Sequence, residues 1–329
     1  MKKRFYLGMV MLLALSMILA ACGGDDNGGG DNGGDEGESN PDFIGLATGG
    51  TGGTYYPLGG TFANLINDET GINTDAITSN ASAENMAMID NGEAEVAFVQ
   101  TDIASYAVEG TQMFDQPIET IRGLATLYPE TIQIVTTADS GIESVEDLAG
   151  KTVSVGESGS GTRLNAEQIL EVHGMSFDDM SVQNLSFDDS TTGIQDGSID
   201  AAFITGGTPT GAVEGLAAQV DVVIVPVAED KAQELINEYP FYSTDEVASG
   251  IYGLESAVPT VAVQAMLAVS SELSDDLVYD ITKAIFENTD SITHPKGEFI
   301  SADTALQGIG IDVHPGAQRY FDEQGVEAE

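Results

Sequence analysis

The sequence has almost no cysteine, tryptophan or positive charge, and these shortages exclude several classes of protein. Its 329 residues include one Cys, no Trp and three His, with 10 Lys and Arg against 54 Asp and Glu. One Cys permits no intramolecular disulfide framework, and three scattered His without a second Cys form no recognisable metal site. We therefore expect no metal and no cofactor. A formal charge of -44 repels nucleic acid, which we exclude as a partner.

The remaining composition is that of a folded protein. Hydrophobic residues make up 42% of the chain and aromatic residues 7%. The length suits one or two α/β domains with a sizeable core, so an intrinsically disordered acidic protein is excluded.

The acidic excess leads to a hypothesis about habitat. Salt shortens the range over which charges repel one another, to about 3 Å at 1 M, so a strongly acidic external protein suits a saline or soda environment. The alternative is that the charge serves solubility alone. Under the saline hypothesis the melting temperature rises as NaCl increases to molar concentration, and a melting temperature independent of NaCl would contradict it.

The N-terminus predicts export and lipid anchoring. Lys2, Lys3 and Arg4 precede an apolar stretch that ends in Leu-Ala-Ala-Cys at Cys22, which resembles a bacterial lipobox. We expect residues 1–21 to be a lipoprotein signal peptide and Cys22 to carry the lipid that anchors the protein outside the cell membrane. The alternative is a transmembrane anchor with a chance Cys, but the apolar run is short for a bilayer. Residues 22–42 are rich in Gly and Asp and read as a flexible tether.

Two similar α/β lobes are predicted from repeated patterns. A strand, a glycine-rich loop and a helix begin at residue 43 and again at residue 152, and a turn followed by a buried strand occurs at 91–99 and 196–204. The apolar run 258–270 fits a strand that crosses back into the first lobe. We expect residues 43–137 plus 259–329 to form lobe 1 and residues 138–258 to form lobe 2, with a hinge between them and a ligand cleft at the strand ends.

The two glycine-rich loops are the candidate ligand contacts. The P-loop pattern G-x-x-x-x-G-K-[S/T] is absent, and no Lys occurs between Lys3 and Lys151, which disfavours a nucleotide site. Residues 158–162 place backbone N–H and hydroxyl donors at the expected start of a helix, where a carboxylate is stabilised. The alternative for both loops is a tight turn that packs a helix against a strand.

Arg163 adjoins the second loop and is one of few cations in the chain. It could grip a ligand carboxylate in a bidentate manner, or it could be an exposed side chain that pairs with Glu167 at i,i+4. A cation in the first turn opposes the helix dipole, which argues slightly for an anion nearby.

Several other residues admit both a ligand role and a structural role. Tyr55 either walls the cleft or packs on the adjacent helix, and Ser82 is a ligand donor or an N-cap. Asp102 accepts a substrate ammonium group or caps a helix expected to begin at Ile103. The three His lie near Pro, Gly or helix ends with no Ser or Cys elbow, so we expect no enzyme activity.

Four segments together resemble the TAXI family of TRAP transporter solute receptors. They are ATGGTGGTYYP at 47–57, SGSGT at 158–162, VPTVAV at 258–263 and LVYDITKAIFEN at 277–288. The resemblance covers about residues 43–325 and implies an α/β fold of the type II periplasmic-binding-protein class, two-lobed with a hinge and an interlobe cleft. Family contacts carried to this chain fall on Thr54, Tyr55, Asn80, Ser82, Gln100, Asp102, Ser158, Ser160, Gly161, Thr162 and Gly207. Arg163, which we add, departs from the acidic or neutral residue typical of its position.

The resemblance implies a receptor that captures a small solute by lobe closure and delivers it to a TRAP membrane permease. Family members are associated with glutamate, glutamine and related carboxylates. Two other functions stay open: a ligand-binding lipoprotein with a sensory or adhesion role, and an enzyme on the same fold. The enzyme would need a Cys, a His or an acid pair in the cleft, and the sequence displays none.

Overall fold

The computed structural model describes residues 40–326, which belong to one compact unit, Glu38–Glu329. The predicted signal peptide, the lipid acceptor Cys22 and the predicted tether as far as residue 39 lie outside the described residues. Between residues 40 and 326, no helix combines the length and the apolar character that a membrane span requires.

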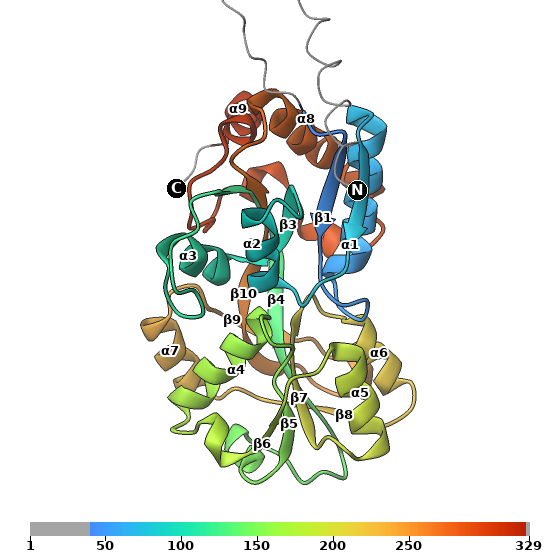
Figure 1. Ribbon diagram of the computed structural model, residues 1–329. Helices are drawn as coiled ribbons and strands as arrows, with labels where there is room; N and C mark the ends of the chain where they lie inside the picture. Colours follow the sequence, from blue (N-terminus) through green and yellow to red (C-terminus); the bar gives the residue numbers. More distant parts are fainter. Residues whose placement is uncertain (1–39, 327–329) are drawn as a thin grey trace, which may run out of the picture. The chain divides into compact units, whose positions relative to one another are not determined.

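Helices and strands alternate along most of the chain and form one ten-stranded sheet with helices on its faces (Figure 1). The strands are β1 (Phe43–Ala47), β2 (Asn73–Ile77), β3 (Val96–Gln100), β4 (Ile121–Thr137), β5 (Thr152–Ser154), β6 (Ser181–Gln183), β7 (Ala201–Gly206), β8 (Val222–Val225), β9 (Ser243–Val247) and β10 (Val258–Ser270). The helices are α1 (Tyr55–Thr70), α2 (Ser82–Asp90), α3 (Thr101–Glu109), α4 (Gly161–Val172), α5 (Phe187–Asp196), α6 (Gly211–Ala217), α7 (Glu229–Glu238), α8 (Asp275–Phe286) and α9 (Pro315–Gln324).

The sheet has a parallel group at each end and two long antiparallel strands in the middle. Its order is β2-β1-β3-β10-β4-β7-β5-β6, with β8 paired to β4 and β9 paired to β10. β1 is parallel to β2 and β3, and β5 is parallel to β6 and β7. β4 and β10 are antiparallel to each other and to the strands beside them, so they join the two parallel groups.

The buried side chains form three clusters, and we call the two that lie on opposite faces of β7 together the second core. The first core lies around β1, β3, α1, α2, α3, α8 and α9. The second core covers both faces of β7, with α4 and α7 on one face and α5 and α6 on the other. Each core is built where apolar helix faces cover a sheet of continuous apolar strands, as parallel sheets require.

β4 and β10 pass from one core to the other and therefore form the hinge. In β4, Leu127 and Tyr128 belong to the first core, whereas Ile132 and Ile134 belong to the second. β10 changes core at Gln264, beside an irregularity in its pairing with β4. This is a two-lobed periplasmic-binding-protein fold, as the sequence predicts. The lobe boundaries at 137/138 and 258/259 stay predictions, because both strands are continuous across the change of core.

Most elements predicted from the sequence are present, but two helix starts differ. β1, β3 and β7 coincide with predicted strands, and β10 has the predicted bounds. α3 begins at Thr101 and not at Ile103, with Gln100 as its N-cap. The N-cap role considered for Ser82 is wrong, because Ala81 occupies that position. Ser82 Oγ instead accepts a hydrogen bond from Gln100 N (3.2 Å).

Candidate ligand-binding site

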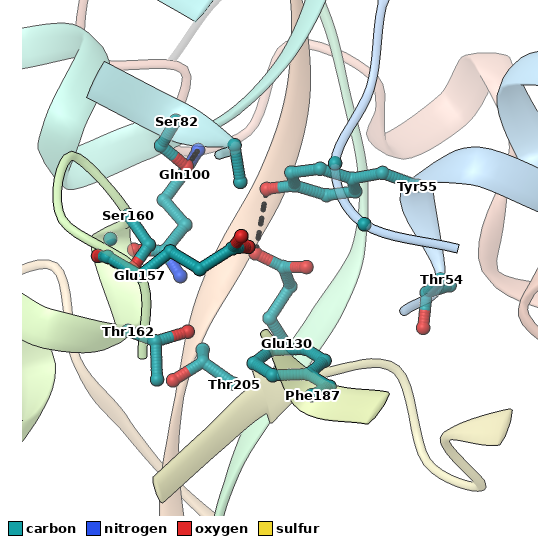
Figure 2. Close-up of a pocket in the computed structure, with 14 residues that line it drawn as sticks. Thr54, Tyr55, Ser82, Gln100, Glu130, Glu157, Ser160, Thr162, Phe187 and Thr205 are labelled. Atoms are coloured by element: carbon teal, nitrogen blue, oxygen red, sulfur yellow. Dashed lines mark hydrogen bonds between the residues drawn. The ribbon is translucent and has the colours of Figure 1, made fainter. Parts of the chain in front are cut away.

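A small cavity lies where the carboxyl ends of β1, β3, β5 and β7 meet (Figure 2). Its volume is about 40 Å³. It is lined by Gly49, Gly50, Thr54, Tyr55, Ala81, Ser82, Gln100, Glu130, Glu157, Ser160, Gly161, Thr162, Phe187 and Thr205. These residues come from both cores, and the position is the one where open α/β sheets bind ligands.

Tyr55 and Glu130 form a buried polar pair in the wall of the cavity. The Tyr55 ring stacks on Phe98, with centroids 4.9 Å apart, and this packing fixes where its hydroxyl lies. The hydroxyl donates a hydrogen bond to Glu130 Oε2 (2.8 Å). Glu130 is only 2% exposed, and burial raises the pKa of its carboxyl to about 8. Burial, together with the nearby Glu130 charge, raises the pKa of Tyr55 well above its usual value.

A second carboxyl group, that of Glu157, lines the same cavity. Burial, with Glu84 and Asp189 nearby, raises the pKa of Glu157. No Lys, Arg or His is among the lining residues, and no ion pair found within residues 40–326 involves Glu130 or Glu157. Lys296 is the cation that acts on Glu130, lowering its pKa slightly from outside the lining. The polar part of the cavity is therefore rich in acceptors and poor in cations.

Two buried polar atoms of the lining have no hydrogen-bond partner in the described part of the chain. They are Gln100 Oε1 and Thr205 Oγ1. Gln100 and Thr205 are 3% and 5% exposed, and a buried polar atom that stays unpaired costs roughly 1–3 kcal/mol. A ligand that hydrogen-bonds to both atoms would remove this cost.

One wall of the cavity is the N-terminus of α4. Ser160 is the N-cap, and its side chain accepts a hydrogen bond from Arg163 N (3.2 Å). Gly161 and Thr162, the first two residues of the helix, line the cavity. Their N–H groups have no partner inside the helix, and together with the dipole they favour an anionic group.

The two cores touch directly around the cavity, so the structure is that of a closed form. Ala83 N donates to Gly159 O (2.9 Å), and Ala212 N donates to Gly52 O (3.0 Å). Thr54 Oγ1 accepts a hydrogen bond from Gly207 N (3.0 Å). These hydrogen bonds hold the two lobes together beside the cavity.

Ala81 adds a strained backbone at the rim of this cavity. Its φ of 70° and ψ of -142° are rare for a residue with a side chain. This turn brings the first N–H groups of α2 to Gly159 O. The strain is thus stored at the point where the two lobes meet.

The structure brings seven of the twelve predicted ligand residues into the lining: Thr54, Tyr55, Ser82, Gln100, Ser160, Gly161 and Thr162. The other five are Asn80, Asp102, Ser158, Arg163 and Gly207. Asn80 and Ser158 are exposed, and Gly207 contacts Thr54 behind the lining.

Arg163 and Asp102 lie outside the cavity lining for different reasons. Arg163 pairs with Glu167 (3.7 Å), the structural alternative of the sequence analysis, and its guanidinium lies 5.0 Å from the centroid of the Phe177 ring. Asp102 is fully buried and bonded to Asn165 (3.3 Å). Our assignment of these two side chains to ligand contact finds no support in this geometry.

Sequence reasoning missed five residues of the lining: Ala81, Glu130, Glu157, Phe187 and Thr205. Glu130 lies inside β4, which is buried along almost its whole length, and nothing in the local sequence indicates that a Glu there is buried. Glu157 follows β5 and directly precedes the candidate loop 158–162, so the general rule about strand ends was a usable signal for it.

Comparison with known proteins gives a family and a fold. A model of the NMT1-like family matches residues 46–325. Among solved structures, a protein of Bordetella bronchiseptica is 15% identical, with a TM-score of 0.54, over 88% of this chain and 83% of that one. PhnD1 from Prochlorococcus marinus, in complex with methylphosphonate, is 10% identical, with a TM-score of 0.52, over 79% of this chain and 88% of that one.

Proposed function

Because this chain belongs to the NMT1-like family and folds as a two-lobed binding protein, we propose that it is an extracytoplasmic solute receptor. It captures a small carboxylate by lobe closure and delivers it to a TRAP-type (TAXI) membrane permease. The observation that carries the proposal is the cavity lined from both cores, with two unpartnered buried polar atoms among its lining residues. Contacts with both lobes stabilise the closed form, and only a difference in affinity between open and closed forms can drive closure.

The charge of the lining narrows the ligand we propose. A carboxylate fits the N-terminus of α4, whereas Glu130, Glu157 and Gln100 Oε1 call for hydrogen-bond donors. Glutamine and glutamate provide both a carboxylate and an ammonium group. A dicarboxylate such as glutarate would place a second negative charge beside two carboxyl groups without a cation. Glutamine has a single carboxylate, so we rank it first; glutamate, whose ammonium group offsets its second carboxylate, comes next, and dicarboxylates without an amino group come last.

The test is a thermal-shift series on residues 22–329 carrying Cys22→Ser, in high salt. Glutarate is the matched control because it has the carbon chain of glutamate and lacks the amino group. A ligand at a hundredfold excess over its Kd adds about 2.7 kcal/mol, which corresponds to roughly 5–10 °C for a chain of this size. We expect this shift for glutamine or glutamate and little for glutarate. No shift with any of the three, in folded and ligand-free protein, contradicts the ligand assignment.

Lipid anchoring through Cys22 and the saline habitat complete the proposal and rest on the sequence alone. Membrane fractionation of the Cys22→Ser chain tests the anchor, since loss of the lipid should release the protein. A sensory or adhesion lipoprotein is the alternative function. It would bind the same ligand and hand its closed form to a receptor, and a membrane permease gene beside this one favours transport over it.

A further inference from the structure

A buried polar cluster joins the two cores away from the ligand cavity. Asn165 Nδ2 donates to Asp102 Oδ2 (3.3 Å) and lies 2.9 Å from the Tyr242 hydroxyl, which donates to Gln168 Oε1 (2.5 Å). All four side chains are at most 4% exposed. We call these four residues the bridging cluster.

The bridging cluster spans the line along which the lobes separate. Asp102 lies on α3, whose Ile103 and Ala104 belong to the first core. Asn165 and Gln168 lie on α4, whose Ala166 and Ile169 belong to the second core. Tyr242, which precedes β9, belongs to the second core as well. Opening the lobes therefore breaks the contact between Asp102 and Asn165 and exposes both to water.

Asp102 has no cationic partner within residues 40–326. The titratable groups around it are Tyr106 on its own helix, Tyr242 across the boundary and Glu130 on β4, and each has its pKa raised in part by the Asp102 charge. Burial raises the pKa of Asp102 itself to about 7, although Ile103 N and Asn165 donate to it. In an open form, water restores the ordinary acidity of this carboxyl.

The amide and hydroxyl groups of the cluster suit either protonation state of Asp102. Asn165 Oδ1 and Gln168 Nε2 have no partner among the described residues. When Asp102 carries a proton, the Asn165 amide can turn over so that Oδ1 accepts from both the carboxyl and the Tyr242 hydroxyl. Gln168 can then turn over and donate from Nε2 to the Tyr242 oxygen. The direction of every bond reverses, and one proton remains on Asp102.

We propose that the bridging cluster holds the lobes closed and that Asp102 and Asn165 are positioning residues, which tie closure to the uptake of one proton. Closing removes Asp102 from water and takes up the proton, and opening returns it. The closed form therefore loses stability as pH rises from about 4 to about 7, by at most tenfold in its equilibrium constant per pH unit, and no further above that range. This inference concerns closure itself and does not depend on which solute is bound.

The test measures closure without any ligand. The only Cys of the chain is Cys22. In the Cys22→Ser chain, the substitutions Asp68→Cys on α1 and Asp230→Cys on α7, both at exposed positions, can therefore carry spin labels. We expect the population with the short, closed distance to fall as pH rises from 5 to 8. Asp102→Asn should keep a large closed population at every pH, because the amide carries no charge to titrate. All of these variants are also made in a chain that carries Glu130→Gln, so that the titration of Glu130, the other buried carboxyl group, does not contribute to the pH dependence.

A matched pair of tyrosines separates the bridging cluster from general packing. Tyr242→Phe removes the link between Asn165 and Gln168 and should reduce the closed population at least several-fold. Tyr239→Phe makes the same change at a hydroxyl that bonds Glu171 within the second lobe (3.0 Å), and should leave closure unchanged. The proposal is overturned if Asp102→Asn keeps the pH dependence of the parent, or if both tyrosine variants close alike. Circular dichroism of each variant verifies that it folds. Glutamine binding is measured in a separate experiment, so that failure of the ligand assignment can be told apart from failure of this proposal.

Discussion

Replacing Glu130 with Gln is expected to raise the free energy of unfolding at pH 9 by roughly 3–5 kcal/mol and to change it little at pH 4.5. The carboxyl has an ordinary pKa near 4.5 when unfolded and about 8 in the folded chain. Between these values the folded state holds a proton that the unfolded state has released, so stability falls as pH rises from 4.5 to 8. Gln removes this loss and keeps an oxygen that accepts from the Tyr55 hydroxyl.

Chemical denaturation at pH 4.5, 7 and 9 measures this effect. Glu69→Gln, the same change at an exposed position of α1, is the control and should show no such pH-dependent gain. A Glu130→Gln gain of equal size at all three pH values would contradict burial as its cause. Because Glu130 costs stability at neutral and alkaline pH, its presence at the cavity argues for a role in ligand binding, and the variant should bind glutamine more weakly.

Gly161→Ala is expected to weaken ligand binding by about a hundredfold or more, the largest functional effect we predict. A Cβ added to Gly161 would lie 1.9 Å from Gln100 Oε1 and 2.4 Å from its Cδ. Gly161 belongs to the second lobe and Gln100 to the first, and Gln100 is too deeply buried to swing aside freely. The added methyl group therefore wedges the cleft open and prevents the contacts that close it.

The measurement is the Kd of the ligand found by the thermal-shift series, together with the melting temperature. Gly215→Ala is the matched control, because Gly215 lies in α6 with no atom within 4 Å of the added Cβ. We expect Gly215→Ala to bind normally and to gain about 0.5–1 kcal/mol of stability from the lower entropy of its unfolded chain. If Gly161→Ala binds as tightly as the parent, the close approach of Gly161 and Gln100 is not required for closure.

The sequence carried enough information for the lobes and for the loops that line the cavity. β10 has the bounds predicted from its continuous apolar run, since a strand buried on both faces needs apolar residues throughout. The glycine-rich loops ended up at the cavity because residues that follow parallel strands meet at one edge of the sheet. Ser160 and Thr162 could therefore be predicted from their position in the chain alone.

The roles of individual charged residues could not be predicted in this way. Arg163 directly follows a lining residue, and Asp102 lies two positions after one, yet Asp102 is buried in the contact between lobes and Arg163 lies against Phe177. Which side of a helix a residue occupies follows from its spacing. What that side faces depends on which helix packs against it. The sequences of α3 and α4 do not indicate that these two helices lie against each other.

The sequence by itself determined the α/β elements, the duplicated pattern, the candidate loops and the acidic, nearly cysteine-free chemistry, because each depends on local spacing or composition. Only the tertiary structure decided that Glu130 shares a cavity with Tyr55 and that Asp102 meets Asn165. These partners are 75 and 63 residues apart in the chain. Their pairing is set by the path of β4 and β10 between two cores, and burial there changes the acidity of both carboxyl groups in a way that no local pattern specifies.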